Sequence, residues 1–596
     1  MDLDTEAHRL GIEVAYLDAY GRPRRVPSAV VERIVRALDA AGTAEVATDA
    51  ADVVPVRRAY QGRLGRRWLL AAQLYGVRSP RNWGHGDFAD LRALIELAAR
   101  VGAAGVGINP LHALFDDDPE RASPYSPNSR LFLNPLYVAV DELPEVAEQP
   151  SAGIADDVAQ LRSSELVDYA GVAALKARCL RAAFRAFAQR ASPERRADFE
   201  DFRRACNPAL ARFASFEVLR RRLRRPWWEW PAEWQNPDAP ALARLREEVG
   251  DEIEYREYVQ WIADRQLMRC RERAQGLGLP IGLYLDVAVG VRPDGFDAWD
   301  APDAIARTLA VGAPPDLLNT AGQNWGLAGF SGVGLKARAF APYREMLRAA
   351  MRYAGAIRLD HVLGLKRLYV IPDGVPADQG AYVRMPFERM LSVTADESRR
   401  HRCIVIGEDL GTVPEGFRGQ VATWGLWSYQ VMLFERDPKG AFHSPSHYSA
   451  HALATFSTHD LPTFAGWIDG DDLRVKRALD IDPGETDGDR ANTIAQLRHA
   501  LRLAPSAAID FPAVVRFLAA TPAKLLAIAL EDVLGTREQV NIPGTIDQHP
   551  NWRRKLPLDL DRIGESEQLR IIARITADSG RSAAVSSDDR PRRKPL

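Results

Sequence analysis

Cysteine is scarce in this chain, and the few cysteines are far apart. The 596 residues include four cysteines, and no two of them form a Cys-x-x-Cys pair. This spacing suggests neither a disulfide framework nor a cysteine-based zinc site. We therefore expect buried free thiols at Cys179, Cys206, Cys270 and Cys403.

Long apolar runs and an excess of charge of one sign are also missing. The N-terminal residues Met-Asp-Leu-Asp-Thr-Glu lack the basic and apolar parts of a secretion signal, and no later run reaches membrane-spanning length. The formal net charge is −2, whereas proteins that bind nucleic acids or anionic membranes normally carry a basic face. We expect a cytoplasmic protein with no nucleic-acid or membrane partner.

The chain does contain enough apolar material for a large core. Hydrophobic residues make up 46% of it and charged residues 27%, which is typical of a globular protein. Its length exceeds that of one ordinary domain, so we expect either several domains or one large barrel with insertions. Residues 1–65 are interpreted as a small N-terminal lobe, and residues 577–596, rich in Ser, Asp, Arg and Pro, as a disordered tail.

Strand and helix patterns alternate from Trp68 onward. Residues 68–75 and 103–110 have strand patterns, and residues 87–102 between them form an amphipathic helical pattern with Asp87 as N-cap and Gly102 after its end. The pattern recurs with strands at 280–286, 356–359 and 403–408 and helices at 342–353 and 387–400. This alternation predicts an α/β fold with a parallel, helix-covered sheet.

Two further stretches predict helices. Residues from about 140 to 275 are rich in Arg, Ala and Glu, and we interpret them as a helical insertion on the barrel. The insertion carries tryptophans between Trp227 and Trp234 that could stack on sugars, although such clusters beside prolines are more often packing residues. Near the C-terminus, Thr521-Pro522 has the pattern of a cap followed by proline and predicts a helix through Leu534.

Four carboxylates occupy the ends of four expected strands, where barrel enzymes carry their catalytic side chains. They are Asp286, Asp360, Glu408 and Asp460. A single pair such as Asp360 with Arg358 is more often structural, and acids at such positions can also cap helices. Four together favour chemistry at a glycosidic bond, which needs a proton donor, a carboxylate at the anomeric carbon and further negative charge. Spacing does not tell which carboxylate takes which role.

The motifs also resemble those of a known family. The matching stretches are Gln73-Leu-Tyr-Gly-Val-Arg-Ser-Pro-Arg-Asn-Trp-Gly84, Asn109-Pro-Leu-His-Ala-Leu-Phe115, Ser123-Pro-Tyr-Ser-Pro-Asn-Ser-Arg130, Gly312-Ala-Pro-Pro-Asp316, Gly322-Gln-Asn-Trp-Gly326, Arg358-Leu-Asp-His361, Gly407-Glu-Asp-Leu-Gly-Thr412, Ser457-Thr-His-Asp460 and Val540-Asn-Ile-Pro-Gly544. In this order the chain resembles 4-α-glucanotransferases of the amylomaltase (disproportionating enzyme) type, distant relatives of the α-amylases. The resemblance implies a (β/α)8 TIM-type barrel over residues 66–576, with a cleft-covering loop at about 312–330.

The resemblance also implies roles for individual residues. Asp360 would be the nucleophile, Glu408 the general acid/base and Asp460 the transition-state stabiliser. Arg358 would orient the nucleophile and keep it ionised, because a nearby cation lowers the pKa of a carboxylate. Two histidines, His361 and His459, would bind sugar hydroxyls, and the glucan-binding site would further include Asp286, Asp316, Asn541, Ser123, Tyr125 and Trp325.

The implied reaction is a retaining double displacement that moves an α-1,4-glucan segment to a glucose or maltooligosaccharide acceptor, without a metal or organic cofactor. Two alternatives remain open: an α-glucan hydrolase that uses the same carboxylates, and a non-catalytic glucan-binding protein that keeps the barrel. The chain departs from the family pattern in its short N-terminal lobe, at residues 327–330 and at Gln430. None of these departures affects a proposed catalytic residue.

Overall fold

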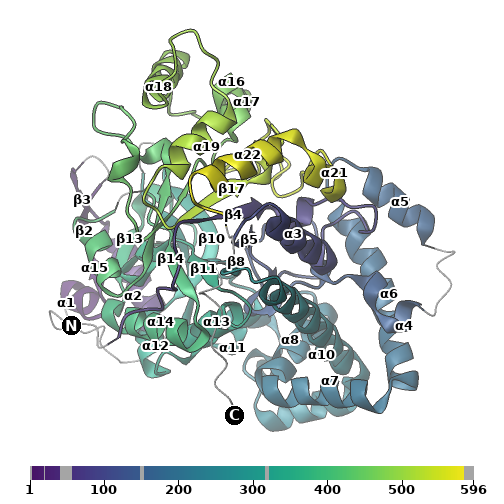
Figure 1. Ribbon diagram of the computed structural model, residues 1–596. Helices are drawn as coiled ribbons and strands as arrows, with labels where there is room; N and C mark the ends of the chain where they lie inside the picture. The colour runs from purple at the N-terminus through teal and green to yellow at the C-terminus, as the bar shows by residue number, and fades with distance from the viewer. Residues whose placement is uncertain are drawn as a thin grey trace.

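A closed barrel of eight parallel strands forms the centre of the protein in the computed structural model, which describes residues 3–18, 21–39, 57–147, 154–315, 321–411 and 413–582 (Figure 1). The strands follow chain order around the ring, and the last pairs with the first. They are β4 (Arg67–Ala72), β5 (Gly105–Ile108), β8 (Gly282–Val287), β11 (Ala356–Leu359), β14 (Ile404–Gly407), β15 (Trp427–Val431), β16 (Ala452–Thr455) and β17 (Leu525–Ala529). The predicted (β/α)8 barrel is confirmed.

The barrel strands are short and apolar because they are covered on both faces. Every residue of β5, β8, β11, β14 and β16 is buried, as expected when side chains fill the inside and helices cover the outside. The strand β11 comes unusually close to its neighbour, since a Cβ atom at Gly355 would collide with the backbone carbonyl of Ile281. A glycine is therefore required where this strand begins.

Three helices of the predicted alternation are present with nearly the expected bounds. They are α3 (Phe88–Arg100), α13 (Ala341–Met351) and α14 (Phe387–His401). Asp87 caps α3 by accepting hydrogen bonds from the backbone N–H groups of Ala89 and Asp90, and the Asp90 carboxylate accepts one from the N–H of Asp87. This capping box satisfies N–H groups that the first turn leaves free, so the helix begins where the sequence predicts.

A group of helices between β7 (Ser129–Leu133) and β8 lies to one side of the barrel (Figure 1). It consists of α4 (Pro144–Ala147), α5 (Ala155–Ser163), α6 (Tyr169–Arg190), α7 (Pro193–Cys206), α8 (Ala209–Leu223), α9 (Ala232–Gln235) and α10 (Ala239–Gly276). The long helix α10 packs against α3 and α8. Trp227 and Trp230 are buried here, and their indole N–H groups donate to the carbonyls of Pro293 and Arg225. These two tryptophans are packing residues.

A second sheet of five strands contains both N-terminal and central segments. Its order is β1 (Ile12–Glu13), β13 (Ala381–Arg384), β12 (Arg367–Pro372), β9 (Ile305–Ala313) and β10 (Gln323–Phe330). The strand β1 pairs with β13, so the first residues of the chain join a sheet formed with residues more than three hundred positions later. The segment expected as a cleft-covering loop, residues 312–330, contains the end of β9 and all of β10, which pair antiparallel, while residues 316–320 lie outside the described residues.

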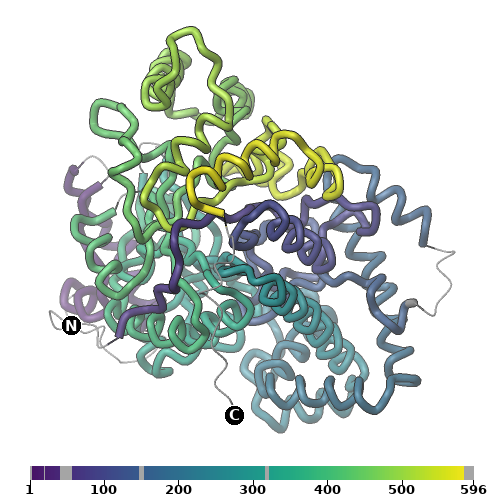
Figure 2. Tube along the Cα trace, in the orientation of Figure 1, coloured from purple at the N-terminus to yellow at the C-terminus, as the bar shows by residue number. Residues whose placement is uncertain are grey.

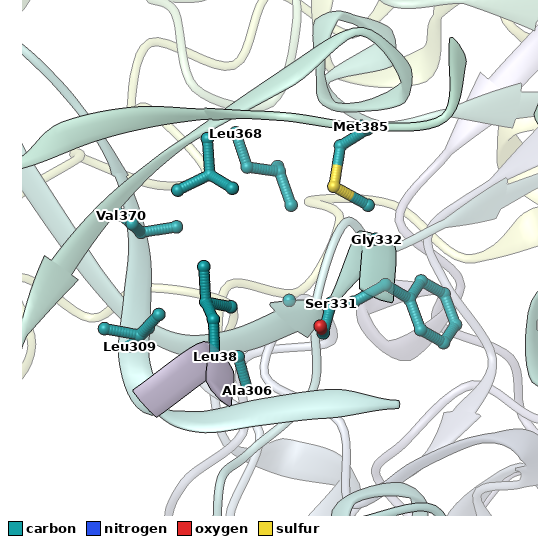
Figure 3. A pocket seen from close by; sticks show the side chains of 11 residues that line it. Leu38, Ala306, Leu309, Ser331, Gly332, Leu368, Val370 and Met385 are labelled. Atoms are coloured by element: carbon teal, nitrogen blue, oxygen red, sulfur yellow. The ribbon is translucent and has the colours of Figure 1, made fainter. Parts of the chain in front are cut away.

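A small apolar cavity lies between this sheet and α2 (Ser28–Asp39). Figure 3 shows Leu38 of α2 extending toward Leu309 and Val370, with Leu368 and Met385 on the other side. No titratable side chain lines the cavity. It belongs to the packing between α2 and the sheet.

The C-terminal part differs from the sequence prediction in two places. The prediction of a helix from Thr521 through Leu534 is wrong. Thr521 lies between α19 (Phe511–Ala519) and the barrel strand β17, and only α20 (Leu530–Val533) is helical between Thr521 and Leu534. The helix α22 (Glu567–Asp578) continues into the expected tail, and the buried Arg581 donates to the carbonyls of Ala519 and Ala523. Figure 2 shows this yellow segment beside the purple β4. The remaining tail, residues 583–596, lies outside the described residues.

The remaining α-helices and strands of the described residues are short or lie outside the barrel ring. They are α1 (Leu3–Arg9), β2 (Ala15–Leu17), β3 (Pro23–Arg25), β6 (His112–Ala113), β7 (Ser129–Leu133), α11 (Phe296–Asp300), α12 (Gly332–Ala337), α15 (Phe417–Thr423), α16 (Phe464–Asp469), α17 (Asp471–Ala478), α18 (Asp487–Ala500) and α21 (Leu560–Glu565). Among the described helices, none combines the length and the apolar character needed to cross a membrane. All four cysteines are free, as expected, but only Cys270 and Cys403 are buried; Cys179 and Cys206 are half-buried.

Candidate active site

Three of the four carboxylates meet around one arginine at the C-terminal end of the barrel. Arg358 Nη1 lies 2.9 and 2.8 Å from the two oxygens of Asp286, and Nη2 lies 2.8 Å from Asp360 Oδ1 and 4.0 Å from Glu408 Oε2. The residues meet because β8, β11 and β14 are neighbours, with Arg358 directly opposite Asp286 in the register. The arginine and its partners form a buried charge cluster in which each ion has an opposite charge nearby.

Asp360 has an unusual protonation equilibrium. Burial raises the pKa of its carboxyl to about 6, the Arg358 guanidinium opposes this rise, and the carboxylates of Asp286 and Glu408 add to it. The resemblance led us to expect a low pKa from the arginine, but removal from water has the larger effect. At neutral pH most of the Asp360 side chains are still ionised.

Glu408 is held by backbone donors. Its Oε1 accepts a hydrogen bond of 2.7 Å from the N–H of Leu410, and its Oε2 accepts one of 2.9 Å from the N–H of His361. Burial raises the pKa of Glu408 despite these bonds and the nearby Arg358. His361 adopts a left-handed backbone conformation with φ of +48°. Such a conformation is uncommon outside glycine and is often found at functional sites.

Asp460 lies in the loop after β16, which is separated from β11 by β14 and β15 in the barrel. Asn541 Nδ2 donates a hydrogen bond of 2.6 Å to Asp460 Oδ1, and His459 Nε2 lies 3.3 Å from Asp460 Oδ2. Burial acts in the opposite direction, but His459 and Asn541 together hold the pKa of Asp460 below its usual value. Burial likewise acts to lower the pKa of His459, yet the Asp460 carboxylate raises it. The pair is therefore stabilised in its charged form.

Tyr125 connects the carboxylates around Arg358 with the pair of His459 and Asp460. Its hydroxyl donates a hydrogen bond of 2.5 Å to Asp286 Oδ2 and lies 3.2 Å from His459 Nδ1, and its ring stacks on the His459 ring at 4.5 Å. Trp325, on β10, places its indole edge-on against His361 with 5.3 Å between the ring centres. The second sheet and the Tyr125 loop therefore both contribute side chains to the barrel mouth.

The structure says less about the two remaining predicted site residues, Ser123 and Asp316. Ser123 is half-buried in the Tyr125 loop and, within the described residues, makes no hydrogen bond to the four carboxylates. Asp316 lies outside the described residues. Of the departures from the family pattern, residues 327–330 are part of β10, and Gln430 donates to Glu435 Oε2 and accepts from the N–H of Ser449. The polar groups of Gln430 are therefore satisfied.

One aromatic residue of the site was missed in the sequence. The ring of Trp552 lies 5.3 Å from that of Tyr125 and 5.4 Å from that of His459. Its neighbours, Pro550, Asn551 and Arg553, give no periodic signal, and the matching motif around Val540 ends before it. No group of three His, Cys, Asp or Glu side chains that could hold a metal ion exists within the described ranges.

Comparison with known proteins gives a consistent result. A family model described as 4-alpha-glucanotransferase matches residues 72–560. The 4-alpha-glucanotransferase of Mycobacterium tuberculosis is 37% identical over 520 residues, which cover 82% of this chain and 71% of that protein. The 4-alpha-glucanotransferase of Haemophilus influenzae is 35% identical over 540 residues, covering 84% and 77%. The crystal structure of amylomaltase from Corynebacterium glutamicum is similar with a TM-score of 0.82 at 25% identity, covering 96% of this chain and 99% of that one.

Proposed function

Because the chain belongs to the 4-alpha-glucanotransferase family, we propose that this glucan-transferring enzyme works by retaining double displacement on α-1,4-linked donors. The observation that carries the proposal is that the carboxylates of Glu408, which is buried, and of Asp360, which is partly buried, lie within 4.0 Å of the same Arg358 nitrogen. Retaining enzymes need two carboxyl groups about 5–5.5 Å apart, and a shared arginine nitrogen is compatible with that spacing.

In the first step, Glu408 donates its proton to the glycosidic oxygen while an Asp360 oxygen attacks the anomeric carbon. The bond from the anomeric carbon to the glycosidic oxygen breaks, and the shortened glucan leaves with a free 4-hydroxyl group. The raised pKa of Glu408, caused by burial, supports its role as proton donor, because it favours the protonated carboxyl that a general acid needs. Asp360 remains mostly ionised there and is available as nucleophile.

In the second step, the 4-hydroxyl of an acceptor attacks the anomeric carbon of the glucosyl ester. Glu408, now a carboxylate, takes the hydroxyl proton, and the bond to Asp360 breaks to restore the nucleophile. The acceptor is glucose or a maltooligosaccharide. Water in the same position would give hydrolysis, so transfer requires that the sugar acceptor occupies the site first.

Asp460 stabilises the positive charge that develops on the sugar ring in both transition states. Its ionised form, supported by His459 and Asn541, suits this role. Tyr125 and Asp286 form a polar edge beside the nucleophile and are proposed to bind sugar hydroxyls. The remaining residues proposed to contact the glucan are Ser123, Asp316, Trp325, His361, His459 and Asn541.

The experiment that tests the proposal is product analysis on maltotriose alone. A transferase converts it into glucose and a ladder of longer maltodextrins with no net gain of reducing ends. A steady increase in reducing ends without longer products would instead identify a hydrolase.

The matched control is the Asp360→Asn variant, which removes the attacking oxygen but keeps the shape of the side chain. It should bind maltodextrins and make no products. Undiminished turnover in this variant would refute the role of Asp360, and a wild-type chain that binds maltodextrin but makes no products would be a non-catalytic glucan-binding protein.

A further inference from the structure

Trp552 has a backbone conformation that a large side chain rarely adopts. Its φ is +61°, in the left-handed region, where a bulky residue is strained. Two hydrogen bonds hold it there: its N–H donates to the carbonyl of Val540 at 3.2 Å, and its carbonyl accepts from the hydroxyl of Tyr169 at 2.6 Å. Strain that is maintained by specific contacts beside an active site suggests a functional reason.

The contacts that hold Trp552 come from the helical insertion. Tyr169 is the first residue of α6, and the segment just before it pairs with the segment just after Trp552. The N–H of Val167 donates to the carbonyl of Arg553 at 2.7 Å, and the N–H of Lys555 donates to the carbonyl of Glu165 at 3.1 Å. The insertion therefore fixes the position of this tryptophan, although none of the insertion residues that the structure describes contributes a carboxylate to the barrel mouth.

The side chain of Trp552 is buried against the two rings that connect the carboxylates. Only 6% of the residue is exposed, and its ring is tilted by 42° to that of Tyr125 and by 50° to that of His459. Tyr125 in turn donates to Asp286, and His459 pairs with Asp460. The indole is thus the third member of an aromatic group whose other two members bind the carboxylates through their polar atoms.

We propose that Trp552 is a positioning residue of the transfer reaction. Its indole restricts the rings of Tyr125 and His459 to the orientation in which the hydroxyl reaches Asp286 and the imidazole reaches Asp460, and Tyr169 locks the tryptophan itself. The proposal rests on the proposed function, in which Asp286 binds the sugar and Asp460 stabilises the transition state. Loss of the indole would let both rings rotate and admit water between them, which weakens contacts that matter most in the transition state.

The test compares Trp552→Ala, Trp552→Phe and Tyr169→Phe in transfer assays on maltotriose. Trp552→Ala should lower kcat by about 10- to 100-fold with little change in KM, since misplacement of supporting groups can cost that much. Trp552→Phe keeps an aromatic ring beside Tyr125 and His459 and should retain most of the wild-type kcat. Tyr169→Phe changes no residue at the barrel mouth itself but removes the hydrogen bond to the Trp552 carbonyl, and it should lower kcat several-fold.

Tyr369→Phe is the matched control for Tyr169→Phe. The Tyr369 hydroxyl also donates to a backbone carbonyl, that of Ala377 at 2.9 Å, and the residue is equally buried, but it lies on β12 in the second sheet. This variant should keep the wild-type kcat. Circular dichroism and melting temperature of all variants separate misfolding from misplacement.

Three results would overturn the proposal. A folded Trp552→Ala variant with wild-type kcat would refute it, and so would an increase in KM alone, which would make Trp552 a direct sugar contact. If Trp552→Ala does not fold, equal kcat values for Tyr169→Phe and Tyr369→Phe would refute it. Failure of the proposed function can be distinguished from failure of this proposal, because in that case the wild-type enzyme itself would produce no ladder of longer maltodextrins.

Discussion

Replacing Asp360 by asparagine should make the protein inactive and more stable at the same time. Burial holds the pKa of Asp360 at about 6 in the folded chain, against 3.8 for an ordinary aspartate. A difference of about two pKa units corresponds to roughly 3 kcal/mol, by which the ionised Asp360 carboxylate lowers the free energy of unfolding at neutral pH. Asparagine has nearly the same shape and no charge, and Arg358 keeps Asp286 as its partner.

The pH dependence of this gain has a definite sign. The raised pKa means that, between pH 3.8 and 6, the folded chain keeps a proton that the unfolded chain has lost. The cost of ionised Asp360 is therefore complete above about pH 6 and disappears as the pH falls below 3.8, where both states carry the proton. The extra stability of Asp360→Asn over the wild type should fall accordingly between neutral pH and pH 4.5.

Urea unfolding and thermal melting at pH 7 and pH 4.5 measure the effect. With an unfolding entropy of about 2.1 cal/mol/K per residue, roughly 3 kcal/mol raises the melting temperature of a chain of this length by about 2 °C. Asp251→Asn, at an exposed position of α10, is the control and should change stability by less than about 0.5 kcal/mol. An Asp360→Asn variant no more stable than the wild type at pH 7 would refute the argument that burial dominates at Asp360.

Two further predictions concern activity. The kcat/KM of the wild-type enzyme on maltotriose should fall as the pH drops through about 6, because Asp360 must be ionised to attack; a rate that is level down to pH 4 would contradict this. Tyr125→Phe should lower kcat/KM about 10- to 100-fold, since a hydrogen bond to a charged group contributes about 1.5–3 kcal/mol. Its fold should persist because Arg358 still pairs with Asp286, and wild-type kinetics in this variant would show that the Tyr125 hydroxyl is dispensable.

Much of the barrel could be predicted because its signals are local. The helix α3 begins at a capping box formed by residues three positions apart, and the apolar runs before Asp286, Asp360 and Glu408 identify buried strands. In a parallel barrel all strands end at the same face, so finding the strand ends also finds the carboxylates. The candidate site followed from the strand pattern before any contact between its members was known.

The failure at Thr521 has an equally physical cause. A threonine before a proline satisfies the requirements of a helix start, but it also suits a tight turn. The apolar residues Leu525–Ala529 that follow were counted as part of a helix, whereas they pair with β16 on one side and β4 on the other. Short apolar runs are ambiguous between helix and strand until their partners are known.

The amino-acid sequence by itself determined the alternation of strands and helices from β4 to β14, the acidic ends of β8, β11 and β14 and, through its motifs, the family. Only the tertiary structure decided that Arg358 divides its donors between Asp286 and Asp360, that burial outweighs this arginine in setting the pKa of Asp360, and that Trp552 reaches Tyr125 and His459. Caps and apolar periods depend on residues a few positions apart. Desolvation and side-chain packing depend on groups hundreds of positions apart, and these become neighbours only when the barrel closes.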